Sequence, residues 1–161
     1  MARDLKPAIR RDAMNPPDNT EETTLAEPAR PLVLVVDDDD AIREALRDLL
    51  DDAGFATLGA RHGLEALKIL AAMATTPTFI LLDLMMPVMD GWAFCDKRRK
   101  SRFFSEVPVI AISAVDVSES NRPAGIDAFL AKPIDLEEFA RLAMRMSGLV
   151  SGRRRPVSVL H

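Results

Sequence analysis

Between residues 31 and 147, short apolar runs alternate with stretches whose apolar residues recur at helical spacing. Runs of four or five apolar residues bounded by turn-forming residues are typical of strands buried on both faces. The run at 79–82 is the clearest, because it ends abruptly in Asp83 and is followed by Pro87 and an Asp90-Gly91 turn. The predicted strands lie at 32–36, 55–60, 79–82, 107–112 and 128–131.

Four stretches carry the apolar spacing of helices with one buried face, at 42–53, 64–73, 91–100 and 136–146. Asp39 or Asp40 can cap the first of them, and Gly54 can end it. Strands that alternate with helices over connections of a few residues predict right-handed βαβ units and a parallel sheet. The predicted fold class is α/β, a doubly wound five-stranded parallel sheet with strand order 2-1-3-4-5.

The chain of 161 residues is long enough for one ordinary domain. We assign 31–147 to that domain, 1–30 to a disordered N-terminal arm and 148–161 to a flexible basic tail. The net charge of −4 gives no argument for nucleic-acid binding. Cys95 is alone, so a disulfide within the chain is excluded, and no stretch resembles a secretory signal or a membrane span. The expectation is a soluble cytoplasmic protein.

Polar residues follow four of the predicted strands. Asp37 and Asp38 follow the first strand, Asp83 the third, Ser113 the fourth and Lys132 the fifth. For Asp83 alone, a helix cap or a solvated strand end is the simpler interpretation. The carboxyl ends of parallel strands share one edge, however, so all five side chains are expected to meet there. Three crowded carboxylates favour Mg²⁺, and a hydroxyl beside an ammonium suits a phosphoryl group.

Four short motifs carry a family resemblance: LVVDDD at 34–39, LDLMMP at 82–87 with DG at 90–91, SA at 113–114 and KP at 132–133. In this order they resemble the receiver domain of two-component response regulators, over about residues 31–147. The resemblance implies the flavodoxin-like receiver fold. It also implies a phosphoprotein that relays signals after taking a phosphoryl group from a sensor histidine kinase or a histidine phosphotransferase.

The resemblance further implies a role for each site residue. Asp83 would be the nucleophile that becomes an aspartyl phosphate. Asp38 and Asp83 would ligate Mg²⁺ directly, together with the backbone carbonyl of Met85, and Asp37 would act through a bound water. Lys132 would pair with the phosphoryl oxygens.

Two further residues would report the phosphorylated state. Ser113 would turn to hydrogen-bond the phosphoryl group, and Phe129 would swing inward as the coupled aromatic switch. Phe129 lacks a hydroxyl, so a switch would work by packing alone, and a core strand residue is an equally good interpretation. Pro133 would follow a cis peptide bond.

The sequence departs from the family between Ser113 and Lys132, where a full fourth helix is usual. The segment 115–125 is short, rich in serine and broken by Pro123, which predicts a helix of at most two turns or an irregular loop. The usual dimer face would be eroded, so we expect a monomer or a weak dimer. Met85 and Val115 are apolar and cannot orient a hydrolysing water, which predicts slow self-dephosphorylation.

Several other residues receive structural interpretations. The basic run 97–100 is predicted to be a solvated helix face, and Trp92 and Cys95 are predicted to be packing residues. His62 has no second ligand nearby in the sequence, which disfavours a metal role. For Arg153–Arg155, a solvated tail is favoured over a docking or nucleic-acid contact.

No DNA-binding or enzyme domain fits after Ser147, so the expected function is a stand-alone receiver whose downstream protein is unknown. We expect no enzymatic activity beyond its own phosphorylation and dephosphorylation. The alternative is a pseudo-receiver that acts as a binding scaffold without phosphate, which the intact site residues disfavour. A phosphatase on a similar fold would need a general acid where this chain has Met85.

Overall fold

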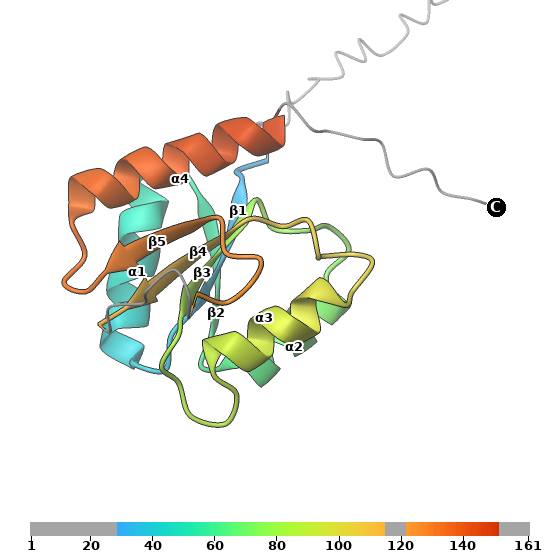
Figure 1. The fold of residues 1–161 in the computed structure, drawn as a ribbon. Helices are drawn as coiled ribbons and strands as arrows, with labels where there is room; N and C mark the ends of the chain where they lie inside the picture. Colours follow the sequence, from blue (N-terminus) through green and yellow to red (C-terminus); the bar gives the residue numbers. More distant parts are fainter. Residues whose placement is uncertain (1–28, 115–121, 152–161) are drawn as a thin grey trace, which may run out of the picture.

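The computed structural model describes residues 29–114 and 122–151. They form a five-stranded parallel sheet with the order β2-β1-β3-β4-β5, which confirms the predicted fold class (Figure 1). The strands are β1 Leu32–Val36, β2 Ala56–Ala60, β3 Phe79–Asp83, β4 Val109–Ser113 and β5 Ala128–Ala131. The described helices are α1 Asp40–Asp52, α2 Gly63–Ala72, α3 Gly91–Arg99 and α4 Leu136–Ser151.

Helices cover both faces of the sheet, so its central strands are buried on two sides (Figure 1). Alternate residues of β1, such as Val33 and Leu34, point to opposite faces. Leu34 packs in the core with α2 and α3, and Val33 packs in the core with α1 and α4. This two-sided burial is why β1 is apolar throughout, and why β3 and β4 are apolar up to their last residues, Asp83 and Ser113, rather than alternating.

Side chains at the helix starts fix where the chain leaves each strand. Asp39 caps α1 by accepting from the N–H groups of Ala41 and Ile42. His62 caps α2, since its Nδ1 accepts from the N–H of Glu65 at 3.2 Å. Asp90 caps α3 in the same way. A cap is a structural role for His62 that helical spacing alone does not reveal.

Several boundaries differ from the sequence predictions, among them the start of β4 and the end of α4. Strand β4 begins at Val109 rather than 107, because Pro108 has no N–H to give to a ladder. Helix α4 continues to Ser151, past the predicted domain boundary at 147. The segment predicted as a short helix or irregular loop lies outside the described residues, except for 122–125, which contains a turn.

The prediction of a solvated face at 97–100 is wrong for Arg98, which is only 1% exposed. The chain folds back over the end of α3, and the Arg98 guanidinium lies among main-chain carbonyls. It donates to the carbonyl oxygens of Phe104, Ser105, Val107 and Gly125 at 2.7–3.1 Å. Arg98 therefore joins the α3–β4 loop to the segment before β5.

Cys95 packs in the core beside α2, as predicted, and burial raises the pKa of its thiol to about 11. Only about one thiol in a thousand would then be ionised at pH 8. We expect a chromogenic disulfide reagent to label the native protein at the rate of unfolding and the urea-unfolded protein at once. Rapid stoichiometric labelling of the native chain would contradict this burial.

None of the helices within the described ranges has both the length and the hydropathy of a membrane span.

Candidate functional site

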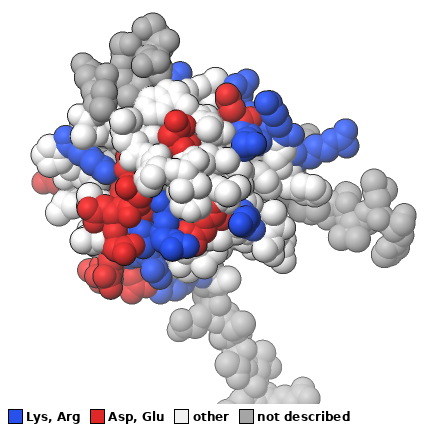
Figure 2. Space-filling view, turned by 90° about the horizontal axis from the view of Figure 1, so that it is seen from below, with Lys and Arg blue, Asp and Glu red and all other residues white. Residues whose placement is uncertain are grey.

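The carboxyl ends of the strands bring three carboxylates together. Asp37 and Asp38 follow β1, and Asp83 is the last residue of β3, the strand that pairs with β1. Carboxylate oxygens of the three residues lie within 4.8 Å of one another. Seen from below in Figure 2, red acidic and blue basic side chains lie side by side on the surface. The strand order thus places residues 46 positions apart, 37 and 83, in one cluster.

Burial and main-chain hydrogen bonds orient two of these carboxylates. Asp37 is 1% exposed and Asp83 is 5% exposed, whereas Asp38 is exposed. The Asp39 N–H donates to Asp37 Oδ1 at 2.9 Å, and the Met85 N–H donates to Asp83 Oδ1 at 3.2 Å. Each of these buried carboxylates therefore has one oxygen fixed by the loop that follows its strand.

Lys132 faces the other oxygen of both buried carboxylates. Its Nζ lies 3.3 Å from Asp37 Oδ2 and 3.3 Å from Asp83 Oδ2. The Lys132 N–H donates to the carbonyl of Ser113 at 2.9 Å, which extends the β4–β5 ladder to the site. The bond between Lys132 and Pro133 is cis, as the family resemblance implied. The ammonium is thus held between the ends of β1 and β3.

The electrostatics of the site are unbalanced. Burial acts to lower the pKa of Lys132, but Asp37 and Asp83 outweigh it and raise that pKa, so the side chain stays protonated at neutral pH. Burial, with a smaller contribution from Asp83, raises the pKa of Asp37 against the opposing effects of the Asp39 N–H and Lys132. Three carboxylates are offset by a single ammonium.

This oxygen-only set with excess negative charge fits a hard divalent cation such as Mg²⁺. It is the one cluster of potential metal-ligating side chains found in residues 29–114 and 122–151. Met85, whose carbonyl was predicted to be a further ligand, lies in the same loop two residues after Asp83. Its side chain is 56% exposed and apolar.

Ser113 lies on β4, the strand that pairs with β3, and Phe129 lies on β5, the next strand of the sheet. Ser113 ends β4, is 1% exposed and pairs in register with Ala131 of β5. Phe129 is half-buried and packs against the core on the α2 and α3 side of the sheet. Both residues are therefore within the two strands that lead to the site, and Phe129 has the packing of a core residue in this structure.

Arg43 supports the site and was not among the sequence candidates. Its Nη1 donates to the main-chain carbonyl of Asp37 at 2.8 Å, and its other amino group pairs with Asp40. A Cβ at Gly59 would lie 3.3 Å from the Arg43 Cδ, so the stem of the arginine runs close over β2. The only sequence signal was the spacing of Asp40 and Arg43 on one helix face.

Gly91 is required by close packing behind Asp83. A Cβ there would lie 2.6 Å from Leu84 Cδ2, 2.8 Å from Leu84 Cα and 3.0 Å from the Asp83 carbonyl oxygen. We expect Gly91→Ala to lower the free energy of unfolding by about 1–3 kcal/mol in urea titrations, because the end of β3 must move.

Gly148→Ala is the matched control for Gly91→Ala. Gly148 lies in α4, and a Cβ there would meet nothing within 4 Å. Alanine should stabilise this helix by about 0.5–1 kcal/mol. Equal effects of the two substitutions would contradict the close packing at Gly91.

Comparison with known proteins gives the same family from three directions. The family model described as "Response regulator receiver domain" matches residues 33–143. The response regulator MprA of Mycobacterium ulcerans (strain Agy99) is 40% identical over 122 residues, which cover 73% of this chain and 49% of that protein. The chain therefore spans about half the length of the curated relatives it matches.

Solved structures of receiver domains share the fold. The signal receiver domain of a signal transduction histidine kinase from Syntrophus aciditrophicus is 28% identical, with a TM-score of 0.69, covering 81% of this chain and 98% of that one. The receiver domain of a sensor histidine kinase from Pseudomonas aeruginosa, which has a magnesium ion coordinated in its active-site cleft, is 26% identical, with a TM-score of 0.67, covering 74% and 99%. With the strand order and the family model, these matches show that the chain belongs to the response regulator receiver domain family.

Proposed function

We propose that the chain accepts a phosphoryl group on the Asp83 carboxylate, with Mg²⁺ held at the acidic cluster. The observation that carries this proposal is the position of Asp83, which lies buried between two further carboxylates and an ammonium 3.3 Å away. A carboxylate is a suitable nucleophile where positive charge can neutralise the phosphoryl oxygens.

The chemistry is a transfer between two groups. An Asp83 carboxylate oxygen attacks the phosphorus atom of a phosphohistidine on a partner, and the phosphorus–nitrogen bond breaks, with its electron pair returning to the imidazole. Lys132 stays between Asp37 and Asp83 and offers its ammonium protons to the phosphoryl oxygens. Asp38 and Asp83 would hold Mg²⁺ directly with the Met85 carbonyl, and Asp37 through a water. When bound, the ion neutralises charge on the phosphoryl oxygens.

The response to phosphorylation would run through β4 and β5. Ser113 would hydrogen-bond the new phosphoryl group, and Phe129 would repack as the coupled switch. Both residues lie on neighbouring strands next to the site, and the dianion adds charge at the edge of the sheet. Met85 offers no polar group to a hydrolysing water, which supports a long-lived phosphoryl group; Val115, its predicted counterpart, lies outside the described residues.

The cellular role follows from the relatives by analogy. We place the chain in a two-component pathway in the cytoplasm, downstream of a sensor histidine kinase or a histidine phosphotransferase. It would act as a receiver, a monomer or weak dimer, that passes its signal to a protein partner rather than to nucleic acid or membrane. It would catalyse no reaction beyond its own phosphorylation and dephosphorylation.

Acetyl phosphate with Mg²⁺ tests the proposal by intact-protein mass spectrometry. Wild-type protein should gain one phosphoryl group, and Asp83→Asn should gain none. Asp39→Asn is the matched control, because asparagine caps α1 as well as aspartate does and residue 39 lies outside the acidic cluster. Failure of the folded wild-type protein to gain the group, or equal labelling of Asp83→Asn, would favour the pseudo-receiver scaffold instead.

A further inference from the structure

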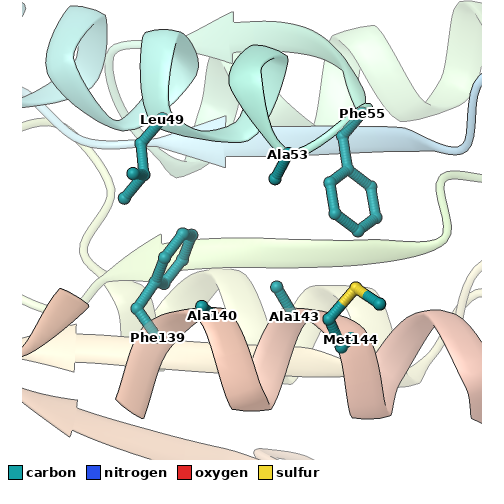
Figure 3. Close-up of a pocket in the computed structure, with 7 residues that line it drawn as sticks. All are labelled: Leu49, Ala53, Phe55, Phe139, Ala140, Ala143 and Met144. Atoms are coloured by element: carbon teal, nitrogen blue, oxygen red, sulfur yellow. The ribbon is translucent and has the colours of Figure 1, made fainter. Parts of the chain in front are cut away.

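Helices α1 and α4 leave an apolar groove between them on their side of the sheet. Figure 3 shows side chains of α1 and α4 facing one another across it, with the ring of Phe55 at one end. Its lining is carbon-rich: Leu49, Ala53, Phe55, Phe139, Ala140 and Met144. Met144 is 66% exposed, so its side chain is open to an occupant of the groove.

The chain enters the fold at one end of this groove. Arg30 donates to the carbonyl oxygens of Asp51 at 3.0 Å, Gly54 at 3.2 Å and Phe55, and its guanidinium pairs with the Asp51 carboxylate at 2.7 Å. Phe55 and Ala53 also line the groove. Residue 30 is thus fixed to the end of α1, and whatever precedes it starts beside the groove.

Charge at this end of the groove favours a basic occupant. The last turn of α1 contains acidic residues and no basic one, although the carboxyl end of a helix favours cations. Arg30 offsets Asp51, whereas Asp48 and Asp52 have no ion pair among the described residues. The stretch 1–11 brings four basic residues against one aspartate, and its larger apolar side chains include Leu5 and Ile9, four residues apart.

We propose that the groove between α1 and α4 is the docking site of the chain's own N-terminal segment, with Leu5 and Ile9 against Met144 and the basic residues of 3–11 beside Asp48 and Asp52. Residues 10–29 reach any point of the groove, at about 3.3 Å per extended residue. Because the segment is tethered at Arg30, its effective concentration is on the order of millimolar, so a weak contact suffices. The docked segment covers the α1 face, and a partner that binds this face must displace it.

Methyl NMR of the full chain tests the proposal. In protein labelled at the methionine methyls, Leu5→Ser with Ile9→Ser should shift the Met144 resonance and leave that of Met85, at the opposite edge of the sheet, unchanged. Val159→Ser with Leu160→Ser is the matched control, because it removes the same kind of side chain from the other end of the chain. An unmoved Met144 methyl would overturn the proposal, and so would a Met144 shift caused only by the Val159 and Leu160 changes.

A spin label separates docking within one chain from association of two copies. The label is attached at Ala13→Cys, because buried Cys95 resists labelling. It should broaden the Met144 methyl of its own chain at low protein concentration. Broadening in a mixture of labelled chains with unlabelled methyl-bearing chains would show that a second copy occupies the groove. Absence of broadening in both samples would show that the segment does not dock.

Discussion

Replacing Arg98 by alanine is expected to lower the free energy of unfolding by about 3–5 kcal/mol. Four main-chain carbonyls would lose a charged donor, and a space the size of a guanidinium would open where the side chain is 1% exposed. A buried acceptor left without a donor costs about 1–3 kcal/mol, and partial entry of water limits the sum. The measurement is urea unfolding followed by circular dichroism.

Arg99→Ala is the control on the same helix. Its side chain is half exposed, and its ion pair with Asp96 is loose at 3.9 Å, so the change should stay within about 0.5 kcal/mol of wild type. Arg98→Lys should recover only part of the loss, because an ammonium cannot span carbonyls from two segments as a planar guanidinium does. A small effect of Arg98→Ala would mean that the bonds merely offset the cost of burying the charge, a cost seen in the lowered pKa of Arg98.

Loss of Arg98 should also destabilise the segment before β5. Its Nη2 donates to Gly125, whose φ of 87° belongs to the left-handed region and which leads into β5. Under native conditions, Arg98→Ala is therefore expected to increase the rate of hydrogen exchange more in residues 122–127 than in β1, each compared with wild type. Uniformly faster exchange would instead indicate a global loss of stability.

The sheet could be predicted from the sequence because its signal is local. Each buried strand is an apolar run, and the rules for parallel βαβ units then fix which strand ends become neighbours. Asp83 and Lys132 were placed together on this basis alone, and their charged atoms lie 3.3 Å apart. The strand order, and the edge of the sheet at which the polar residues meet, follow from the apolar pattern and the topology rules, without knowledge of any side-chain contact.

Arg98, His62 and Arg43 could not be predicted because their partners are main-chain groups. A carbonyl has no sequence signature, so the basic run around Arg98 looked like any solvated helix face. The acceptors of Arg98 lie six to 27 residues away in the sequence. Arg43 holds the Asp37 carbonyl in the same way, and His62 accepts from a main-chain N–H. Polar side chains that bond to backbone need the folded chain to be recognised.

Asp38→Asn is expected to weaken Mg²⁺ binding by more than about tenfold, since even groups one step removed from a metal change affinity by about 10–100-fold. Asp38 contributes one of the three carboxylates, and no hydrogen bond or ion pair of its side chain is found in the described residues. In this structure no ion pair of its own therefore offsets its repulsion by Asp37 and Asp83. A bound Mg²⁺ would offset the repulsion among these carboxylates and would therefore stabilise the folded chain.

Asp38→Asn should have opposite effects on stability without and with Mg²⁺. Thermal unfolding under both conditions therefore tests the prediction. With chelator present, Asp38→Asn should unfold at the same temperature as wild type or a higher one, because repulsion is removed. With Mg²⁺ at one hundred times the wild-type dissociation constant, wild type should gain about 2.7 kcal/mol and the variant much less. Asp39→Asn, one residue away and outside the cluster, should respond to Mg²⁺ as wild type does.

Mg²⁺-independent unfolding of the wild-type protein would show that the crowded carboxylates do not hold the ion. An unchanged Mg²⁺ response in Asp38→Asn would remove Asp38 from the ligand set.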